Sequence, residues 1–143
     1  MRVKTLLADS AEVREGLLFL LGGGWNQIGP LPTPFAIAGV LEVDWDETNS
    51  RHRIEFIIQD EDGVPFLVPT PTGDQPFRLG SEFDVGRPPG STRGETFTMP
   101  IAVPIVPLPF APGHRYVVLT LINGEERDRL AFKVRPAPQL SAP

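Results

Sequence analysis

The sequence predicts an all-β fold of about eight or nine short antiparallel strands, with at most one short helical turn. Three observations support this prediction. Apolar and polar residues alternate with a period of two along much of the chain of 143 residues. Signals that start a helix are nearly absent. Turn signals, above all Asp62-Gly63 and Asn123-Gly124, separate the alternating segments.

The N-terminal part contains two expected strands, near residues 2–8 and 16–21. Between them, the segment DSAEVREG is predicted to form the single helical turn, with Asp9 or Ser10 as its cap and Gly16 at its end. The chain then passes through three glycines to Trp25 and three prolines. We expect the glycines to bend the strand out of its sheet and the prolines to span a crossover to the other sheet.

Two half-buried strands are expected near residues 35–45 and 51–59. Alternation places the large apolar residues of each strand on its inward face. These inward residues are Phe35, Ile37, Leu41, Val43 and Trp45 in the first strand, and Ile54, Phe56 and Ile58 in the second. Glu55 is expected to point outward. The Asp62-Gly63 turn then predicts a hairpin that returns along residues 64–69.

A strand near residues 76–85 is expected to lead through a loop rich in proline and glycine to another near 95–105. The second of these strands carries Pro100 and Pro104, which have the same parity. Both missing backbone N–H groups therefore lie along one side of the strand. Because that side cannot pair, we expect an edge strand that is guarded against aggregation.

The C-terminal third contains the clearest hairpin, with strands near 114–122 and 126–135 around Asn123-Gly124. The first of these strands is apolar on both faces, which predicts a central position in its sheet. Turn signals recur about every ten residues, which is the spacing typical of an immunoglobulin-like β-sandwich. We expect one domain over residues 1–135 and a flexible tail over residues 136–143.

The composition argues against several classes of protein and partner. Cysteine is absent, which excludes disulfides and thiolate chemistry, and we expect a cytoplasmic location. A net charge of −5 without a basic stripe argues against nucleic acid as a partner. The longest apolar run is far shorter than the roughly 20 residues that span a bilayer, so we expect no membrane partner.

No pattern of residues predicts a reaction centre. His52 and His114 are too few for a histidine metal site, and each lies beside an arginine. The acidic residues 60–62 are typical of a hairpin turn, and those at 44–47 lack carboxylates that face them across a cleft. The glycines at 22–24 lack the helix and lysine of a phosphate-binding loop. The sequence therefore predicts no enzyme, and no catalytic, metal-binding or cofactor-binding residue.

One stretch remains as a candidate interaction surface. An aromatic residue beside an extended proline-rich backbone is typical of surfaces that bind proteins. The candidate residues are Trp25, Ile28, Leu31, Pro32 and Pro34. The alternative interpretation is that Trp25 covers one end of the core and the segment is only a crossover. The direction of the Trp25 side chain decides between the two.

These observations favour a non-enzymatic protein-interaction or structural module that binds a protein partner or copies of itself. One version is a component of a larger lattice, such as a decoration protein on a phage-like capsid, and would be located in that assembly. The alternative is a domain that binds a small ligand or carbohydrate, with Trp25, Trp45 or Tyr116 stacking on a sugar. A hydrolase that uses the acidic loops is a third hypothesis.

Several motifs also resemble those of a known family. The most specific are the turn GGGW, the turn DEDG and the C-terminal hairpin GHRYVVLTLINGE, with PTPFAIAGVLEVDWDE and MPIAVPIVPLPFAPG between them. In these motifs the chain resembles a bacterial, mainly actinobacterial, family of small β-sandwich proteins catalogued as a domain of unknown function. The resemblance covers most of the chain. It implies a fold, and it brings no catalytic residues.

Overall fold

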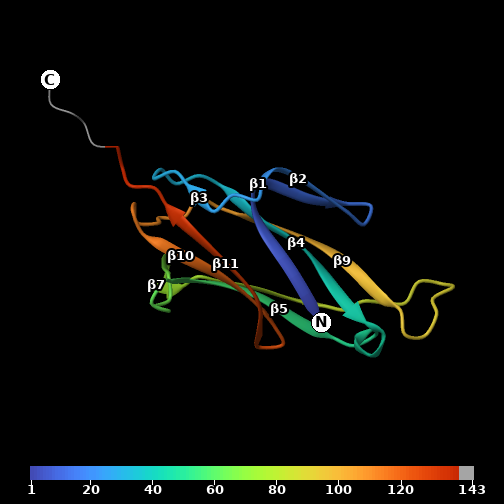
Figure 1. Cartoon of the computed structure of the whole chain (residues 1–143). Helices are drawn as coiled ribbons and strands as arrows, with labels where there is room; N and C mark the ends of the chain where they lie inside the picture. The colour runs from blue at the N-terminus through green and yellow to red at the C-terminus, as the bar shows by residue number, and fades with distance from the viewer. Residues whose placement is uncertain (139–143) are drawn as a thin grey trace, which may run out of the picture.

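A computed structural model describes residues 1–138, and in this range the protein is all-β, as predicted (Figure 1). One short 3-10 turn, η1 (Trp45–Glu47), is present, and no helix within the described range could cross a membrane. The strands are β1 (Arg2–Arg14), β2 (Leu17–Gly23), β3 (Gln27–Ile28), β4 (Phe35–Asp44), β5 (His52–Asp60), β6 (Leu67–Thr70), β7 (Gly73–Pro76), β8 (Arg78–Phe83), β9 (Thr96–Ile105), β10 (Arg115–Ile122) and β11 (Glu125–Val134).

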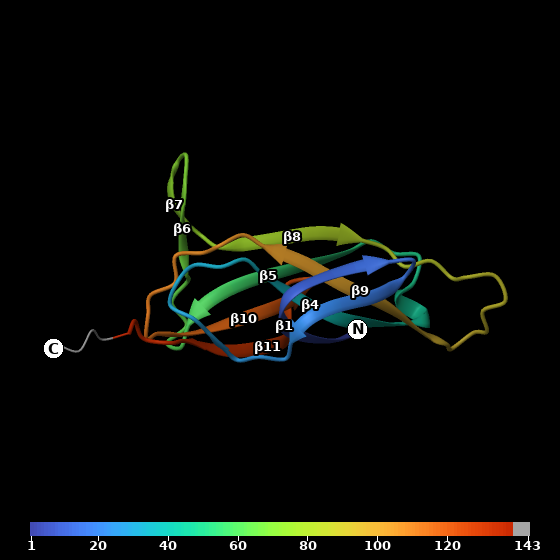
Figure 2. The same ribbon diagram turned by 90° about the horizontal axis from the view of Figure 1, so that it is seen from above.

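Most strands belong to two sheets that face each other (Figure 1). The first sheet has the order β2-β1-β4-β9, and the second has the order β3-β11-β10-β5-β8. Neighbouring strands are antiparallel except β3 and β11, which run parallel. The strands β6 and β7 form a separate ribbon that projects from the body of the molecule (Figure 2).

The core lies between the two sheets and is built from the inward faces of their strands. The residues predicted to face inward in β4 and β5 are buried, with one exception: Trp45 is half-buried, because it lies in η1 after β4 has ended. Burial of each such side chain contributes about 1.5–3 kcal/mol relative to exposure. The largest side chains that are fully buried are Leu7, Ile37, Leu41, Val43, Ile58, Val118, Thr120 and Val134.

The C-terminal hairpin forms as predicted. Asn123 (φ 52°) and Gly124 (φ 84°) supply the two positive φ angles that connect β10 to β11. β10 lies between β11 and β5, which confirms its central position. Its inward-facing residues are buried, and so is Leu119 on its outward face. Burial on both faces explains why the strand is apolar on both faces.

β9 is an edge strand, as the two prolines predicted. It pairs with β4 along its whole length, with Pro100 opposite Val40 and Pro104 opposite Ala36. Because proline has no N–H to donate, these positions fit the side of β9 that has no neighbouring strand. The first sheet cannot extend readily beyond β9.

The predicted helical turn at residues 9–16 is wrong. β1 continues to Arg14, and Glu15 (φ 49°) and Gly16 (φ 74°) form a two-residue turn into β2. A turn with two residues at positive φ matches the twist of a hairpin. The hairpin is therefore more stable than the helical turn that Asp9 or Ser10 would cap. The short helical turn forms instead at η1, where the expected strand over residues 35–45 has already ended at Asp44.

Two other connections differ from expectation. The turn at Gly63 (φ 82°) forms, but the returning chain pairs with β5 only at Gln59 and Pro65 before β6 turns away to pair with β7. The expected strand over residues 76–85 is divided between the end of β7 and the separate strand β8. Of the expected tail over residues 136–143, residues 139–143 lie outside the described residues.

The stretch of glycines and prolines after β2 is the expected crossover. Gly22 (φ 61°) and Gly24 (φ 92°) turn the chain out of the first sheet. The chain then forms β3 beside β11 in the second sheet and returns to the first sheet at β4. A Cβ atom on Gly22 would meet the Asp9 carboxylate, so a side chain there would have to displace the Asp9 side chain.

The two sheets are joined on one side of the molecule by a side chain. Asp128 of β11 accepts hydrogen bonds from the backbone N–H of Thr5 at 2.8 Å and from its hydroxyl at 2.5 Å. At one corner, the Tyr116 hydroxyl accepts a hydrogen bond from the Ala111 N–H at 2.9 Å. On the opposite side of the molecule, the edge strands β8 and β9 do not pair with each other within residues 1–138.

Candidate functional site

Trp25 points toward the core. Its side chain is half-buried and packs edge-on against Phe35, with ring centroids 6.0 Å apart and an interplanar angle of 68°. Its indole N–H is buried and has no hydrogen-bond partner among residues 1–138. Trp25 therefore covers one end of the core, as the crossover interpretation expects.

The other candidate surface residues divide into two groups. Ile28 lies in β3, pairs with Val134 and packs against the core. Leu31 is 76% exposed, and Pro32 and Pro34 are exposed beside it. Two of the five predicted residues thus contribute to packing, and three remain accessible on the crossover.

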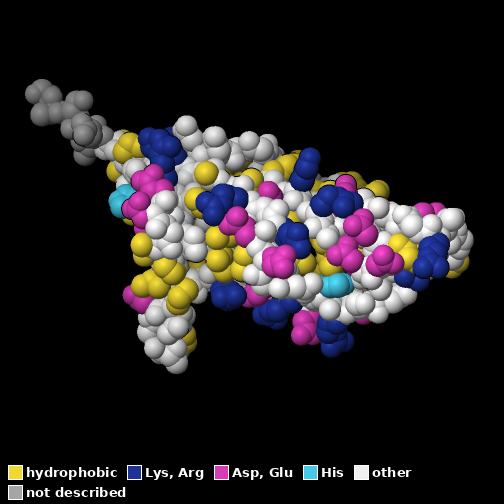
Figure 3. All heavy atoms as spheres, turned by 60° about the horizontal axis from the view of Figure 1, so that its bottom comes forward, with side chains coloured by type: hydrophobic (Ala, Val, Ile, Leu, Met, Phe, Trp, Pro, Cys, Tyr) yellow, Lys and Arg dark blue, Asp and Glu magenta, His cyan; other side chains and the backbone are white. Residues whose placement is uncertain are grey.

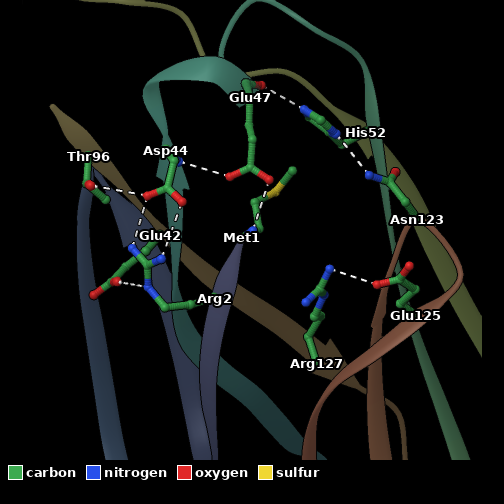
Figure 4. A network of polar contacts seen from close by, with 10 residues as sticks. All are labelled: Met1, Arg2, Glu42, Asp44, Glu47, His52, Thr96, Asn123, Glu125 and Arg127. Carbon is green, nitrogen blue, oxygen red and sulfur yellow. Dashed lines mark hydrogen bonds and ion pairs between the residues drawn. The ribbon is translucent and has the colours of Figure 1, made fainter. Parts of the chain in front are cut away.

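Two of the acidic residues at 44–47, Asp44 and Glu47, lie in a polar network at the end of the molecule that holds the N-terminus (Figure 4). Arg2 donates to Asp44 at 3.1 Å and to Glu42 at 2.8 Å, and the bond from Arg2 lowers the pKa of Asp44. Burial opposes ionisation of Glu47, but hydrogen bonds from the Met1 ammonium at 2.9 Å and the Asp44 N–H outweigh it and lower its pKa. These carboxylates hold the chain terminus in place.

His52 and the acidic turn also have structural partners. The Nε2 atom of His52 lies 2.7 Å from the Glu47 carbonyl oxygen, and its Nδ1 atom lies 3.0 Å from the Asn123 side-chain nitrogen (Figure 4). The Asp60 carboxylate accepts a hydrogen bond from the Asp62 N–H at 2.8 Å, as expected of a turn. Within residues 1–138, no group of three or more histidine and acidic residues could hold a metal ion.

The outer face of the second sheet carries charges of both signs. Glu55 faces outward as expected, yet it is only 7% exposed, because Arg78 and Arg53 lie over it. The hydrogen bond from Arg78 lowers the pKa of Glu55 despite its desolvation. Figure 3, which brings the bottom of Figure 1 forward, shows acidic and basic side chains interspersed over the visible face. That face presents no field of a single sign to a charged partner.

A surface that the sequence analysis missed lies on β2. Six of the seven residues of β2 are exposed, although five of the seven are large and apolar. Leu17, Phe19 and Leu21 share one face of the strand and are 62%, 50% and 74% exposed. We call these three residues the β2 surface. A cluster of this kind is unusual on a protein that stays alone in solution.

The two edges of the first sheet differ in chemistry. β9 carries two prolines, whereas β2 carries neither proline nor a charged residue. Proteins protect a free edge with prolines, charges or a bulge, because its unpaired N–H and C=O groups can recruit another strand. β2 has neither of the first two protections. The two edges of the first sheet therefore differ in how they are protected.

A second missed feature is a groove of about 550 Å³ between the edges β8 and β9. Ile54 and Phe56 of β5 form its floor, and Val13 from the β1–β2 hairpin reaches its rim. Figure 2 shows that hairpin lying over β4 and β9. The walls are formed by Leu79, Gly80, Ser81 and Phe83 on one side and by Met99, Pro100, Ile101, Ala102, Val103 and Pro104 on the other. We call this the β8–β9 groove.

The three aromatic residues considered for sugar stacking all take part in packing. Tyr116 is buried among Phe66, Phe110 and Phe132. Trp45 is half-buried, and the Arg87 guanidinium lies 3.7 Å over its ring. Trp25 contacts Phe35 as described above. Each of the three rings therefore has an aromatic or guanidinium packing partner.

Comparison with known proteins places the chain in a family. No curated protein and no solved structure matches the sequence. The profile of one family, described as a family of unknown function, matches residues 4–135. This match covers both sheets, from β1 to β11, except the first two residues of β1. The chain therefore belongs to the family of unknown function DUF6941.

Proposed function

We propose that the protein is a non-enzymatic interaction module that associates with a second copy of itself through the β2 edge. The observation that carries this proposal is the β2 surface, in which Leu17, Phe19 and Leu21 are exposed on an edge strand without proline or charge. An uncharged apolar edge complements itself, because apolar side chains meet apolar side chains when two copies pair. Such strand addition is a common mode of protein association.

Hairpin geometry defines which backbone groups are free to pair. Arg14 and Leu17 flank a two-residue turn and so exchange hydrogen bonds with each other. The residues at alternating positions, Leu18 and Leu20, then direct their N–H and C=O groups away from β1. These groups supply the hydrogen bonds of the proposed contact.

Antiparallel pairing of two copies has one natural register. If Leu18 pairs with Leu20 of the second copy, Phe19 lies opposite Phe19 of that copy on the two-fold axis. The same register brings each Leu17 opposite a Leu21. The exposed apolar residues then form one continuous cross-strand row, and each such pair contributes about 0.2–1 kcal/mol beyond an alanine pair.

The proposal extends to the arrangement of the sheets, which we interpret as an immunoglobulin-like sandwich. In support, β1, β4 and β9 face β8, β5, β10 and β11, and the chain changes sheet between β4 and β5 and between β9 and β10. The bond between the Tyr116 hydroxyl and the Ala111 N–H at the start of β10 corresponds to the tyrosine corner of such folds. A cytoplasmic location agrees with the absence of cysteine.

Light scattering coupled to size-exclusion chromatography tests the self-association. We expect twice the chain mass of 15.7 kDa for the wild type. Leu20→Pro removes an N–H from the free edge and should give monomers, whereas Thr98→Pro removes one from the blocked edge of β9 and should not. Leu21→Ser should weaken association more than Leu31→Ser, because Leu21 lies on the β2 surface and Leu31 does not. The two variants are matched controls, since the two leucines are 74% and 76% exposed.

A single engineered cysteine checks the register. Because the chain has no cysteine, Phe19→Cys offers one thiol per copy, placed opposite its equivalent on the two-fold axis. Mild oxidation should convert this variant to a covalent dimer and should leave Leu31→Cys mostly unlinked. A monomeric wild type, or equal effects of the β2 and control variants, would contradict the proposal. A larger species would instead indicate a lattice with further contacts.

A further inference from the structure

The β8–β9 groove lies where the two sheets are not joined to each other. On the opposite side, Asp128 of β11 bonds to Thr5 of β1 and holds the sheets together. β8 and β9 are not paired with each other, and the buried residues Ile54 and Phe56 form the floor of a groove of about 550 Å³ between them. This volume lies within the range of roughly 300–1,000 Å³ that small-molecule sites occupy.

The chemistry of the groove is uniform. None of its thirteen lining residues is ionisable, and Ser81 carries the one hydroxyl group among them. Leu79 is 36% exposed, and Phe83, Met99 and Val103 are half-buried, so these walls present apolar surface to solvent. Such a site gains free energy from an apolar occupant and offers nothing to neutralise a buried charge.

The backbone of the groove limits what can occupy it. Pro100 and Pro104 remove two N–H donors from the β9 wall. A peptide strand laid along β9 would therefore leave its own carbonyl groups unpaired, which costs free energy for each group. A hydrocarbon chain has no hydrogen bonds to satisfy and incurs no such cost. Met99 adds an unbranched, adaptable side chain suited to an irregular apolar ligand.

From this chemistry we infer that the β8–β9 groove binds the unbranched hydrocarbon chain of an uncharged amphiphile. The chain lies against Ile54 and Phe56 between the walls formed by Leu79 and Met99, and the polar end stays at the open mouth. This site is separate from the β2 surface, and binding there does not require self-association.

Methionine provides an internal probe and its control. The chain has two methionines, of which Met99 lines the groove while Met1 lies at the N-terminus beside Glu47. With the full chain labelled at the methionine methyl carbons, NMR titration with hexanol, octanol and decanol should shift the Met99 signal and leave the Met1 signal in place. The dissociation constant should fall about two- to fourfold for each methylene added, because each one buries apolar area.

Matched variants locate the binding. Leu79→Gln places an amide on the groove wall, whereas Leu67→Gln makes the same change on β6, outside the groove. Decanol affinity should fall at least fivefold in the first and less than twofold in the second. Ser81→Phe, at an exposed position, should fill the groove and block binding without removing a core residue. An unshifted Met99 signal, equal affinity for hexanol and decanol, or equal effects of the two leucine variants would overturn the inference.

Discussion

Truncation of Trp25 measures whether this residue belongs to the core or to a docking surface. In the structure its ring packs edge-on against Phe35 and its N–H lacks a partner within the described range. Two variants separate these two features. Trp25→Ala removes both the packing and the N–H, whereas Trp25→Phe keeps an aromatic ring beside Phe35 and removes the N–H.

The two variants differ in expected magnitude. Truncation of a fully buried tryptophan to alanine costs about 3–5 kcal/mol of unfolding free energy. Trp25 is half-buried, and its truncation leaves no hydrogen-bond partner behind within residues 1–138, so we expect a net loss of about 2 kcal/mol. Trp25→Phe loses only part of the ring and gives up an indole N–H that has no partner within residues 1–138. The free energy of unfolding should then stay within about 1 kcal/mol of the wild type.

Urea denaturation followed by far-UV circular dichroism measures both values. Small proteins lose about 1–3 kcal/mol of stability per molar urea, so Trp25→Ala should lower the midpoint by about 1 M. An unchanged midpoint in Trp25→Ala would show that the side chain contributes nothing to the core. A loss in Trp25→Phe as large as in Trp25→Ala would contradict the expectation that a phenyl ring beside Phe35 retains most of the packing.

Two further predictions concern Asp128, which links the two sheets, and Glu55, which lies beside two arginines. Asp128→Ala should cost about 1–3 kcal/mol in urea denaturation, because it leaves the Thr5 N–H without its partner, and a loss below about 0.5 kcal/mol would contradict the proposed link between the sheets. The pKa of Glu55 is lowered in the folded protein by Arg78, so its stabilising effect is present above its ordinary pKa of 4.5 and is lost as the pH falls through the lower, folded pKa. The stability gap between wild type and Glu55→Gln should therefore narrow from pH 6 to pH 3, and a constant gap would refute this assignment.

Local sequence signals predicted those parts of the fold that depend on neighbouring residues. The Asn123-Gly124 turn, the alternation in β4 and β5 and the prolines of β9 each act through backbone geometry over a few residues. The turn at Glu15 and Gly16 was missed because glutamate is uncommon at positive φ. The short strand β3 was missed because its two residues are defined by β11, which lies far along the chain.

The candidate sites were harder to predict, because they depend on which strands become neighbours. The apolar segment at residues 17–21 reads as a buried strand, and only the sheet order places β2 at an edge. The β8–β9 groove has no sequence signal, since its walls come from two different sheets. Trp25 was recognised as unusual, but its direction depends on the packing of Phe35.

If two copies join through β2 as proposed, the difference between β2 and β9 limits how far their shared sheet can grow. A sheet with two equally receptive edges can add copies without end, as in a fibril. In this chain the first sheet offers one receptive edge, and the prolines of β9 close the other. Two molecules that join through β2 leave only proline-bearing edges at the ends of their shared sheet, so growth along this sheet terminates at two copies.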